Sequence, residues 1–168
     1  MKKVRQGTWE TNSSSTHAIC IHKQEVMALP NYIYFGLEDL NDSYVWDTLQ
    51  QRANYLHTII AMMGGRTEYC NRKALVTKVL KSYGIASEWA KIKWCPDGSA
   101  SDWYEIKDTC ASVIIDKIIP NEKLLVQYLF GKNSEIIMGY DDLFDQYLQQ
   151  EKEKFIEGEE YEYLEEEY

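Results

Sequence analysis

The strongest structural signal in this sequence is a long amphipathic stretch in its first half that two glycines close. Its apolar residues recur at steps of three and four, the spacing that places side chains on one face of an α-helix. They are Val45, Leu49, Ala53, Leu56, Ile60 and Met63. Asp42 or Ser43 can cap the first turn, and Gly64-Gly65 ends the stretch. We therefore predict a helix from about Asp42 to Met63 with one continuous apolar face.

Short segments before and after this stretch have the composition of β-strands. His17–His22 is apolar or small on both faces, which is typical of an inner strand. Tyr32–Phe35 follows a Pro-Asn pair and ends at Gly36. The other predicted strands are Lys3–Trp9, Glu88–Trp94, Tyr104–Ile106 and Glu135–Met138, with a turn at Cys95–Ser99.

Three further segments are predicted to be helical. The first, Asn71–Tyr83, is expected to turn Leu75, Val79 and Leu80 inward. The other two are Asn121–Phe130, which follows a proline, and a final helix from about Asp141 to Phe155. The segment Ser112–Ile119 fits either a strand or a helix.

Together these elements predict a single α+β domain over residues 1–157, in which a small mixed or antiparallel sheet packs against three to four helices. A chain of 168 residues is long enough to bury a core without disulfides or metals. Residues 158–168 repeat Glu and Tyr with little to bury, so we predict a flexible acidic tail there.

The net charge of −9 is divided unevenly along the chain. Twelve acidic residues and two lysines lie between Asp141 and Tyr168, whereas the first 140 residues hold sixteen basic and fifteen acidic ones. Within that near-neutral body, Arg66–Trp94 contains seven basic residues against two acidic ones. We therefore expect a basic middle and a strongly acidic end.

Cysteine spacing and hydropathy indicate the compartment. The four cysteines, at positions 20, 70, 95 and 110, form no CxxC pair, which favours free thiols over a disulfide framework. No apolar stretch follows Met1–Arg5, and no segment approaches 18 apolar residues. These observations predict a cytoplasmic protein with no membrane partner.

The most unusual segment is the polar run Glu10–His17, in which eight residues carry one carboxylate, one amide, five hydroxyls and one imidazole. One interpretation is structural, because Asn, Ser and Thr side chains bond nearby backbone groups in tight connections. In the other, the run is an anion-binding nest in which His17 acts as general acid or base, oriented by Glu10. A serine nucleophile paired with His17 stays open, although no GxSxG elbow is present. The predicted catalytic residues are Glu10, Asn12, Ser14 and His17, and the predicted substrate contacts are Ser13, Ser15 and Thr16.

The segment Arg5–Ala18 resembles the opening of a family of small proteins from bacteriophages and mobile elements, R-x-G-x-[FW]-E-T-N-S-S-S-T-H-S. Phe130–Gly139 is similar to a weaker pattern of the same family. Ala18 stands where serine is usual, which removes one hydroxyl and keeps the loop. The resemblance implies a phage-type origin, with a bacterial host cell as the location, and it favours a functional Glu10–His17 run.

Metal and cofactor sites have weaker support. His17 and His22 are five positions apart, so on a straight strand they point to opposite faces and cannot share a metal. His57 falls on the predicted helix and is typical of a packed or rim histidine. Carboxylates at 141, 142 and 145 could hold Mg²⁺, but they begin a helix, where acids favour the helix dipole. We expect neither a metal nor a cofactor.

The two charged regions are candidate binding surfaces. The basic middle, interleaved with Tyr and Trp, fits either an RNA-binding footprint or a solvated face that the acidic tail balances. Its predicted contacts are Arg66, Arg72, Lys73, Lys78 and Lys81. The tail either keeps the chain in solution or imitates a nucleic-acid backbone in a basic groove of a partner. Its predicted contacts are Glu159, Glu160, Tyr161, Glu162 and Tyr163.

These features lead to two functional expectations. The first is a phage or prophage accessory protein that inhibits a bacterial defence system, in the manner of anti-CRISPR proteins. It would do so by binding a nucleic-acid-handling effector, either a protein or a ribonucleoprotein. The alternative is an enzyme of the nuclease or phosphoryl-transfer type that acts on RNA phosphodiesters or nucleotides through the Glu10–His17 run.

Overall fold

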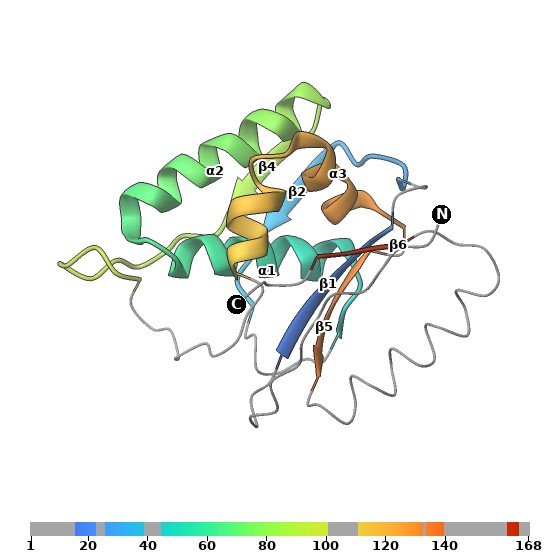
Figure 1. Cartoon of the computed structure of the whole chain (residues 1–168). Helices are drawn as coiled ribbons and strands as arrows, with labels where there is room; N and C mark the ends of the chain where they lie inside the picture. Colours follow the sequence, from blue (N-terminus) through green and yellow to red (C-terminus); the bar gives the residue numbers. More distant parts are fainter. Residues whose placement is uncertain are drawn as a thin grey trace.

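A computed structural model describes residues 16–22, 26–38, 45–100, 111–132, 134–139 and 161–164. Over this part of the chain the fold is α+β in one domain, as predicted, with helices lying between two small sheets (Figure 1). The strands are β1 (Thr16–His22), β2 (Tyr32–Phe35), β3 (Val45–Trp46), β4 (Ala86–Trp89), β5 (Glu135–Gly139) and β6 (Tyr161–Leu164). The helices are α1 (Leu49–Met62), α2 (Gly65–Ser82), the π-helix η1 (Val113–Ile118) and α3 (Glu122–Phe130).

The larger sheet is antiparallel and has the strand order β3-β5-β1-β6. The predicted inner strand β1 is confirmed, because it pairs with β5 on one side and with β6 on the other. Its Ile19 and Ile21 are fully buried, as expected for alternate residues that face the core. Strand β5 confirms the prediction for Glu135–Met138 and extends it by one residue.

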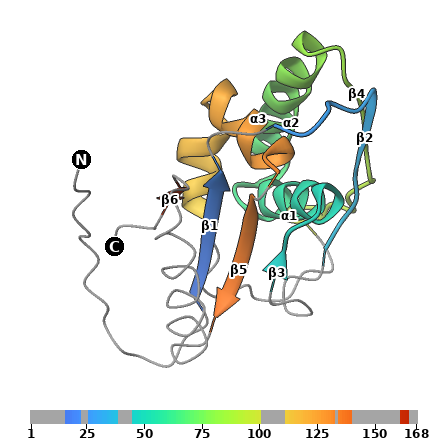
Figure 2. The same cartoon turned by 90° about the vertical axis from the view of Figure 1, so that its right-hand side faces the viewer.

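The smaller sheet joins β2 and β4 in parallel, although α1 and α2 lie between them in the sequence. Strand β2 has its predicted bounds, and its residues alternate: Ile33 and Phe35 are buried, whereas Tyr32 and Tyr34 are exposed. Figure 2 shows α1 between this pair of strands and the larger sheet. Because α1 has neighbours on both sides, its burial extends beyond the apolar face that the periodicity predicts. Its buried residues run around the helix and include Arg52, Tyr55, His57 and Thr58.

Helix α1 begins later than the periodic pattern predicts. Val45 and Trp46 belong to β3, where they pair with Ile137 and Ile136 of β5, so the predicted helical start was wrong. Pairing with β5, which is distant in the sequence, buries Trp46 completely. The helical periodicity of the neighbouring residues cannot predict this burial. The helix instead begins after Thr48, and Asp42 and Ser43 lie outside the described residues.

Thr48 forms a capping box with Gln51. The Thr48 hydroxyl accepts a hydrogen bond from the Gln51 backbone N–H at 3.2 Å, and the Thr48 N–H donates to Gln51 Oε1 at 3.2 Å. We expect Thr48→Ala to lower the free energy of unfolding by about 1 kcal/mol, measured by urea denaturation. Thr67→Ala, at an exposed position inside α2, is the matched control and should change stability by less than about 0.5 kcal/mol. Equal stability of the two variants would contradict the capping role.

Helix α2 begins six residues before the predicted Asn71. Gly64, with φ of +98°, caps it in the left-handed conformation, so the glycine pair that ends α1 also starts α2. The prediction that Leu75 points inward was wrong, because this side chain is 49% exposed. Tyr69, Val76 and Leu80 form the buried face instead.

The segment that fitted either a strand or a helix is helical. Ala111 and Ser112 lead into η1, and the Ile119 N–H donates to the Ile114 carbonyl five residues earlier at 2.9 Å. After Pro120, Asn121 caps α3 by accepting from the Leu124 N–H at 3.2 Å, which confirms the predicted helix. The turn at Cys95–Ser99 is also confirmed, with Gly98 at φ of +85°.

Other predicted elements fall outside the described residues: Lys3–Trp9, Tyr104–Ile106 and Asp141–Phe155. Among the helices that the structure describes, none combines the length and the apolar character that a membrane crossing requires.

Candidate functional site

The predicted polar run is described only at its carboxyl-terminal end. Thr16 and His17 open β1, with their Cα atoms opposite those of Gly139 and Met138 in β5. The backbone of His17 is therefore fixed within a sheet, as predicted for the start of an inner strand. The rest of the run, residues 10–15, lies outside the described residues, and with it the predicted site residues Glu10, Asn12, Ser13, Ser14 and Ser15.

Part of the acidic end is built into the larger sheet. Tyr161, Glu162 and Tyr163 lie in β6, which pairs antiparallel with β1 at the sheet edge. The sequence predicts flexibility here because the segment has little to bury, but the backbone hydrogen bonds of strand pairing do not depend on burying a side chain. Glu159 and Glu160 lie outside the described residues.

The predicted basic contacts on α2 divide into two groups. Arg66, Lys78 and Lys81 are exposed. Arg72 and Lys73 are half-buried and engaged within the chain. The Arg72 guanidinium donates to the Met63 carbonyl, and the Lys73 ammonium lies 5.7 Å from the ring centroid of Tyr69 and 5.4 Å from that of Trp89.

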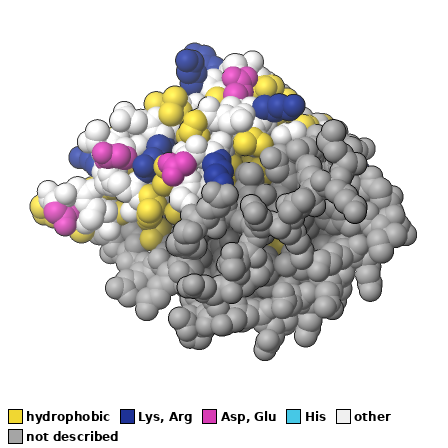
Figure 3. Space-filling model, viewed as in Figure 1, with side chains coloured by type: hydrophobic (Ala, Val, Ile, Leu, Met, Phe, Trp, Pro, Cys, Tyr) yellow, Lys and Arg dark blue, Asp and Glu magenta, His cyan; other side chains and the backbone are white. Residues whose placement is uncertain are grey.

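The aromatic rings near these cations are mostly unavailable for stacking on nucleic-acid bases. Tyr69 is buried. Trp89 is half-buried, and its ring stacks on that of Phe35 with the two centroids 3.9 Å apart. Trp94 is also half-buried, whereas Tyr83 is 41% exposed. On the face seen in Figure 3, basic side chains are interspersed with acidic and apolar ones and form no continuous basic stripe among the described residues. Of the four rings, Tyr83 alone is exposed, so the described residues on this face offer few of the stacking groups and no continuous cationic track of the kind that single-stranded nucleic acid uses.

His57 is the centre of a buried polar network on α1. Its Nδ1 lies 2.7 Å from the Gly36 carbonyl oxygen, and its Nε2 lies 3.0 Å from the Tyr69 hydroxyl. Because a carbonyl can only accept, Nδ1 carries the proton and Nε2 accepts from Tyr69. The Trp89 ring meets the imidazole edge-on at 5.0 Å. The prediction of a packed histidine is confirmed.

Burial determines the protonation state of this network. Desolvation lowers the pKa of His57 to about 4, and the nearby Lys73 cation acts in the same direction. Burial raises the pKa of Tyr69 to about 12. Both side chains are thus neutral at neutral pH, and their closure from solvent makes them a structural network and not an acid–base pair for a substrate.

Arg52 is a further buried polar residue, which the sequence analysis did not single out. Its guanidinium donates to the carbonyls of Asp47 and Ser134 through Nη1. Through Nη2 it donates to those of Leu129 at 2.9 Å and Gly131 at 3.2 Å. The signal that could have identified it is its place on the apolar stripe, three residues after Leu49 and four before Leu56.

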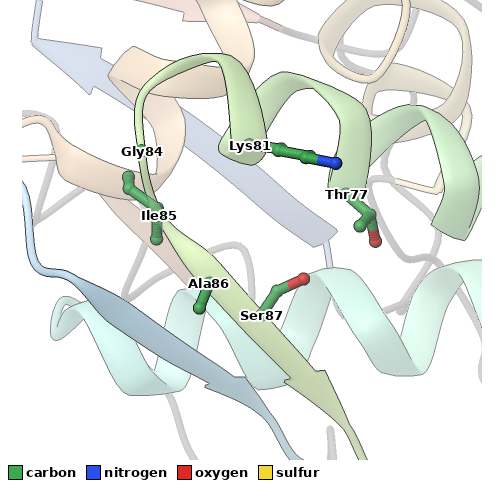
Figure 4. Close-up of a pocket in the computed structure, with 6 residues that line it drawn as sticks. All are labelled: Thr77, Lys81, Gly84, Ile85, Ala86 and Ser87. Carbon is green, nitrogen blue, oxygen red and sulfur yellow. The ribbon is translucent and has the colours of Figure 1, made fainter.

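A shallow pocket of about 370 Å³ lies between the end of α2 and the start of β4. Figure 4 shows the side chains of Thr77 and Lys81, from α2, on one side of it and that of Ser87, from β4, on the other. No described residue forms a hydrogen bond or ion pair with any of these three side chains. The pocket therefore offers one ammonium group and two hydroxyl groups to a ligand. Its other lining residues are Gly84, Ile85 and Ala86.

Metal ligands do not cluster in the part of the chain that the structure describes: no three His, Cys, Asp or Glu side chains are arranged to hold an ion. Cys70 and Cys95 are free thiols, as predicted. Among the described residues, the features available for function are thus strand β6 of the acidic end and the polar pocket beside β4. Comparisons of the chain with protein-family models, with curated proteins and with solved structures found no match.

Proposed function

We propose that this protein inhibits a bacterial defence system by binding a nucleic-acid-handling effector through its acidic end. The observation that carries the proposal is strand β6, which attaches the acid-rich sequence to the edge of the larger sheet. The resemblance of Arg5–Ala18 to a family of phage and mobile-element proteins supports the defence context.

The charge division supports binding by imitation of a nucleic acid. A segment with a net charge of −10 over 28 residues (twelve acidic, two basic) is a suitable ligand for a groove that evolved to hold phosphates. Its attachment through β6 reduces the conformational entropy that binding would otherwise have to remove. Tyr161 and Tyr163 belong to the same strand and bring aromatic groups to the acidic sequence.

His57 adds nothing to the enzymatic alternative, which depends on Glu10 and His17. This histidine is fully buried, both of its ring nitrogens are hydrogen-bonded within the chain, and its pKa is lowered to about 4. It is therefore unsuited to proton transfer with a substrate.

The proposal is tested in bacteria that carry an active RNA-guided defence system and are challenged with a targeted phage. Expression of the protein should restore infection. Replacing Glu159, Glu160 and Glu162 together by glutamine should reduce that restoration at least about tenfold in plaque counts, because it removes three charges from the acidic end. The matched control neutralises three exposed acids of the body, Asp47, Glu68 and Asp116, and should retain the effect.

The same assay separates binding from catalysis. For a binding inhibitor, His17→Ala and Glu10→Ala should leave the restored infection unchanged, and capture of the purified effector should weaken steeply with added salt. Loss of the effect in these two variants, with the tail variant unaffected, would replace the proposal by the enzymatic alternative. Failure to restore infection against a panel of RNA-guided effectors would refute both.

A further inference from the structure

The smaller sheet has one edge whose backbone groups have no partner among the described residues. The N–H groups of Ala86 and Ala90 donate to the carbonyls of Asn31 and Phe35, each at 2.9 Å, so these residues of the β4 segment face β2. Backbone groups alternate in direction along a strand, so those of Ser87 and Trp89 point away from β2. No described residue pairs with them, so β4 is the edge of this sheet as far as the structure describes it. Within the described part of the chain these two N–H groups and two carbonyls are therefore unpaired, as at a strand edge that another strand can join.

The polar pocket lies along this same edge. Ala86 and Ser87 both line it, although the side chains of successive strand residues belong to opposite faces of a sheet. Ser87 lies opposite the buried Ile33 and points to α2, whereas Ala86 points away from it, so the pocket lies between α2 and the side of β4 that carries Ser87 (Figure 4). Its lining residues belong to α2, to β4 and to the turn between them, so the pocket adjoins the edge of β4 that faces away from β2.

The charges around the edge are mostly positive and favour an acidic partner. Lys81 lines the pocket and Lys78 is exposed one turn earlier on α2, while Lys91 is exposed just after β4. The only acidic residue of the strand is Glu88, whose Oε2 already accepts from the Tyr32 hydroxyl at 2.8 Å. A carboxylate that enters the pocket would meet the Lys81 ammonium and the hydroxyls of Thr77 and Ser87, which have no described partner.

We propose that the open edge of β4 binds an extended acidic segment of a partner protein, which adds to the sheet as a third strand and places a carboxylate side chain in the pocket. Strand addition supplies the main-chain hydrogen bonds with Ser87 and Trp89, and the pocket supplies the selectivity for an acidic residue. This surface lies on a different sheet from β6, so the inference does not rest on the proposed function.

Two other occupants fit the edge less well. A second copy of this chain would bring its own α2 to the same interface and place Lys78 and Lys81 of both copies close together. A nucleic acid has no alternating N–H and C=O groups to pair with a strand edge, and the Trp89 ring beside this edge is stacked on Phe35.

The test uses two fluorescein-labelled heptapeptides with the full-length protein, one alternating valine with glutamate and the other alternating valine with lysine. The acidic peptide should bind in fluorescence anisotropy, and the basic peptide at least about tenfold more weakly. At saturation, the amide protons of Ser87 and Trp89 should become protected from hydrogen exchange, as detected by NMR. The amide proton of Ser99, in the exposed turn that follows β4, is the internal control and should exchange at an unchanged rate.

Matched charge reversals then identify the pocket. Lys81→Glu should weaken binding of the acidic peptide at least about tenfold, and Lys78→Glu, on the same helix but outside the pocket, by less than about threefold. The proposal is overturned if the acidic peptide does not bind at millimolar concentration, or if it binds without protecting the two amides. Concentration-dependent dimerisation that protects them without peptide, or their protection by a single-stranded RNA, would likewise overturn it.

Discussion

Arg52→Met is expected to lower the free energy of unfolding by about 3–5 kcal/mol, the largest effect that we predict for a single substitution. Methionine keeps an unbranched side chain of similar length but removes every donor. The variant would leave four carbonyls without their guanidinium partner in a site where Arg52 is fully buried. Two of them, Leu129 and Gly131, belong to the carboxyl-terminal end of α3, where a positive charge also favours the helix dipole.

Lysine at the same position tests whether geometry or charge matters. Its ammonium is a single point, whereas the planar guanidinium reaches carbonyls from three segments of the chain. We expect Arg52→Lys to recover less than half of the lost stability in urea denaturation. Arg66→Met, on the exposed surface of α2, is the control and should stay within about 0.5 kcal/mol of the unsubstituted protein. A loss below about 1 kcal/mol in Arg52→Met would contradict the anchoring role.

His57 should make stability fall as the pH drops from about 6.5 to about 4. The pKa of His57 is lowered to about 4 in the folded protein, while the unfolded chain titrates near the ordinary value of 6.5. Between these two pH values the unfolded state binds the proton more readily, so acidification favours unfolding. The contribution is fully retained above about pH 6.5. The loss from this one group should reach about 1 kcal/mol at pH 5.5 and about 3 kcal/mol at pH 4.

His57→Phe isolates this effect from the titration of carboxylates. Phenylalanine cannot titrate, but it leaves the Gly36 carbonyl and the Tyr69 hydroxyl without their partner, so the variant should be less stable at about pH 7.5. The stability difference between the two proteins should then shrink by about 1 kcal/mol at pH 5.5, measured by urea denaturation. A difference that does not change with pH would show that His57 has an ordinary pKa in the folded state.

The sequence predicts elements well where local chemistry and burial agree. Asn121 caps α3 after a proline, and this helix ends at the predicted residue. Tyr32–Phe35 alternates buried and exposed residues before a glycine, and this strand begins and ends where it was predicted. Strand β1, whose residues between its two histidines are apolar or small, has a neighbouring strand on each edge, as its composition predicts.

Prediction fails where a contact with a distant segment decides. Val45 continues the helical period of α1, yet it pairs with Ile137, far along the chain, and belongs to a strand. Leu75 fits an apolar stripe on α2, but Tyr69, Val76 and Leu80 define the face that meets the core. Local periodicity cannot distinguish two neighbouring faces of a helix until the partner surface is known.

By itself, the sequence determined the α+β class, the type of most described elements and the division of charge between a basic middle and an acidic end. Those properties depend on local backbone preference and on composition, which need no partner. Only the tertiary structure decided that His57 and Arg52 are buried, that Lys73 covers two rings, and that β4 has an edge without a described partner beside Lys81. Each of these results from segments that are distant in the sequence and meet in the fold, where solvent exclusion and hydrogen-bond geometry fix a side chain's role.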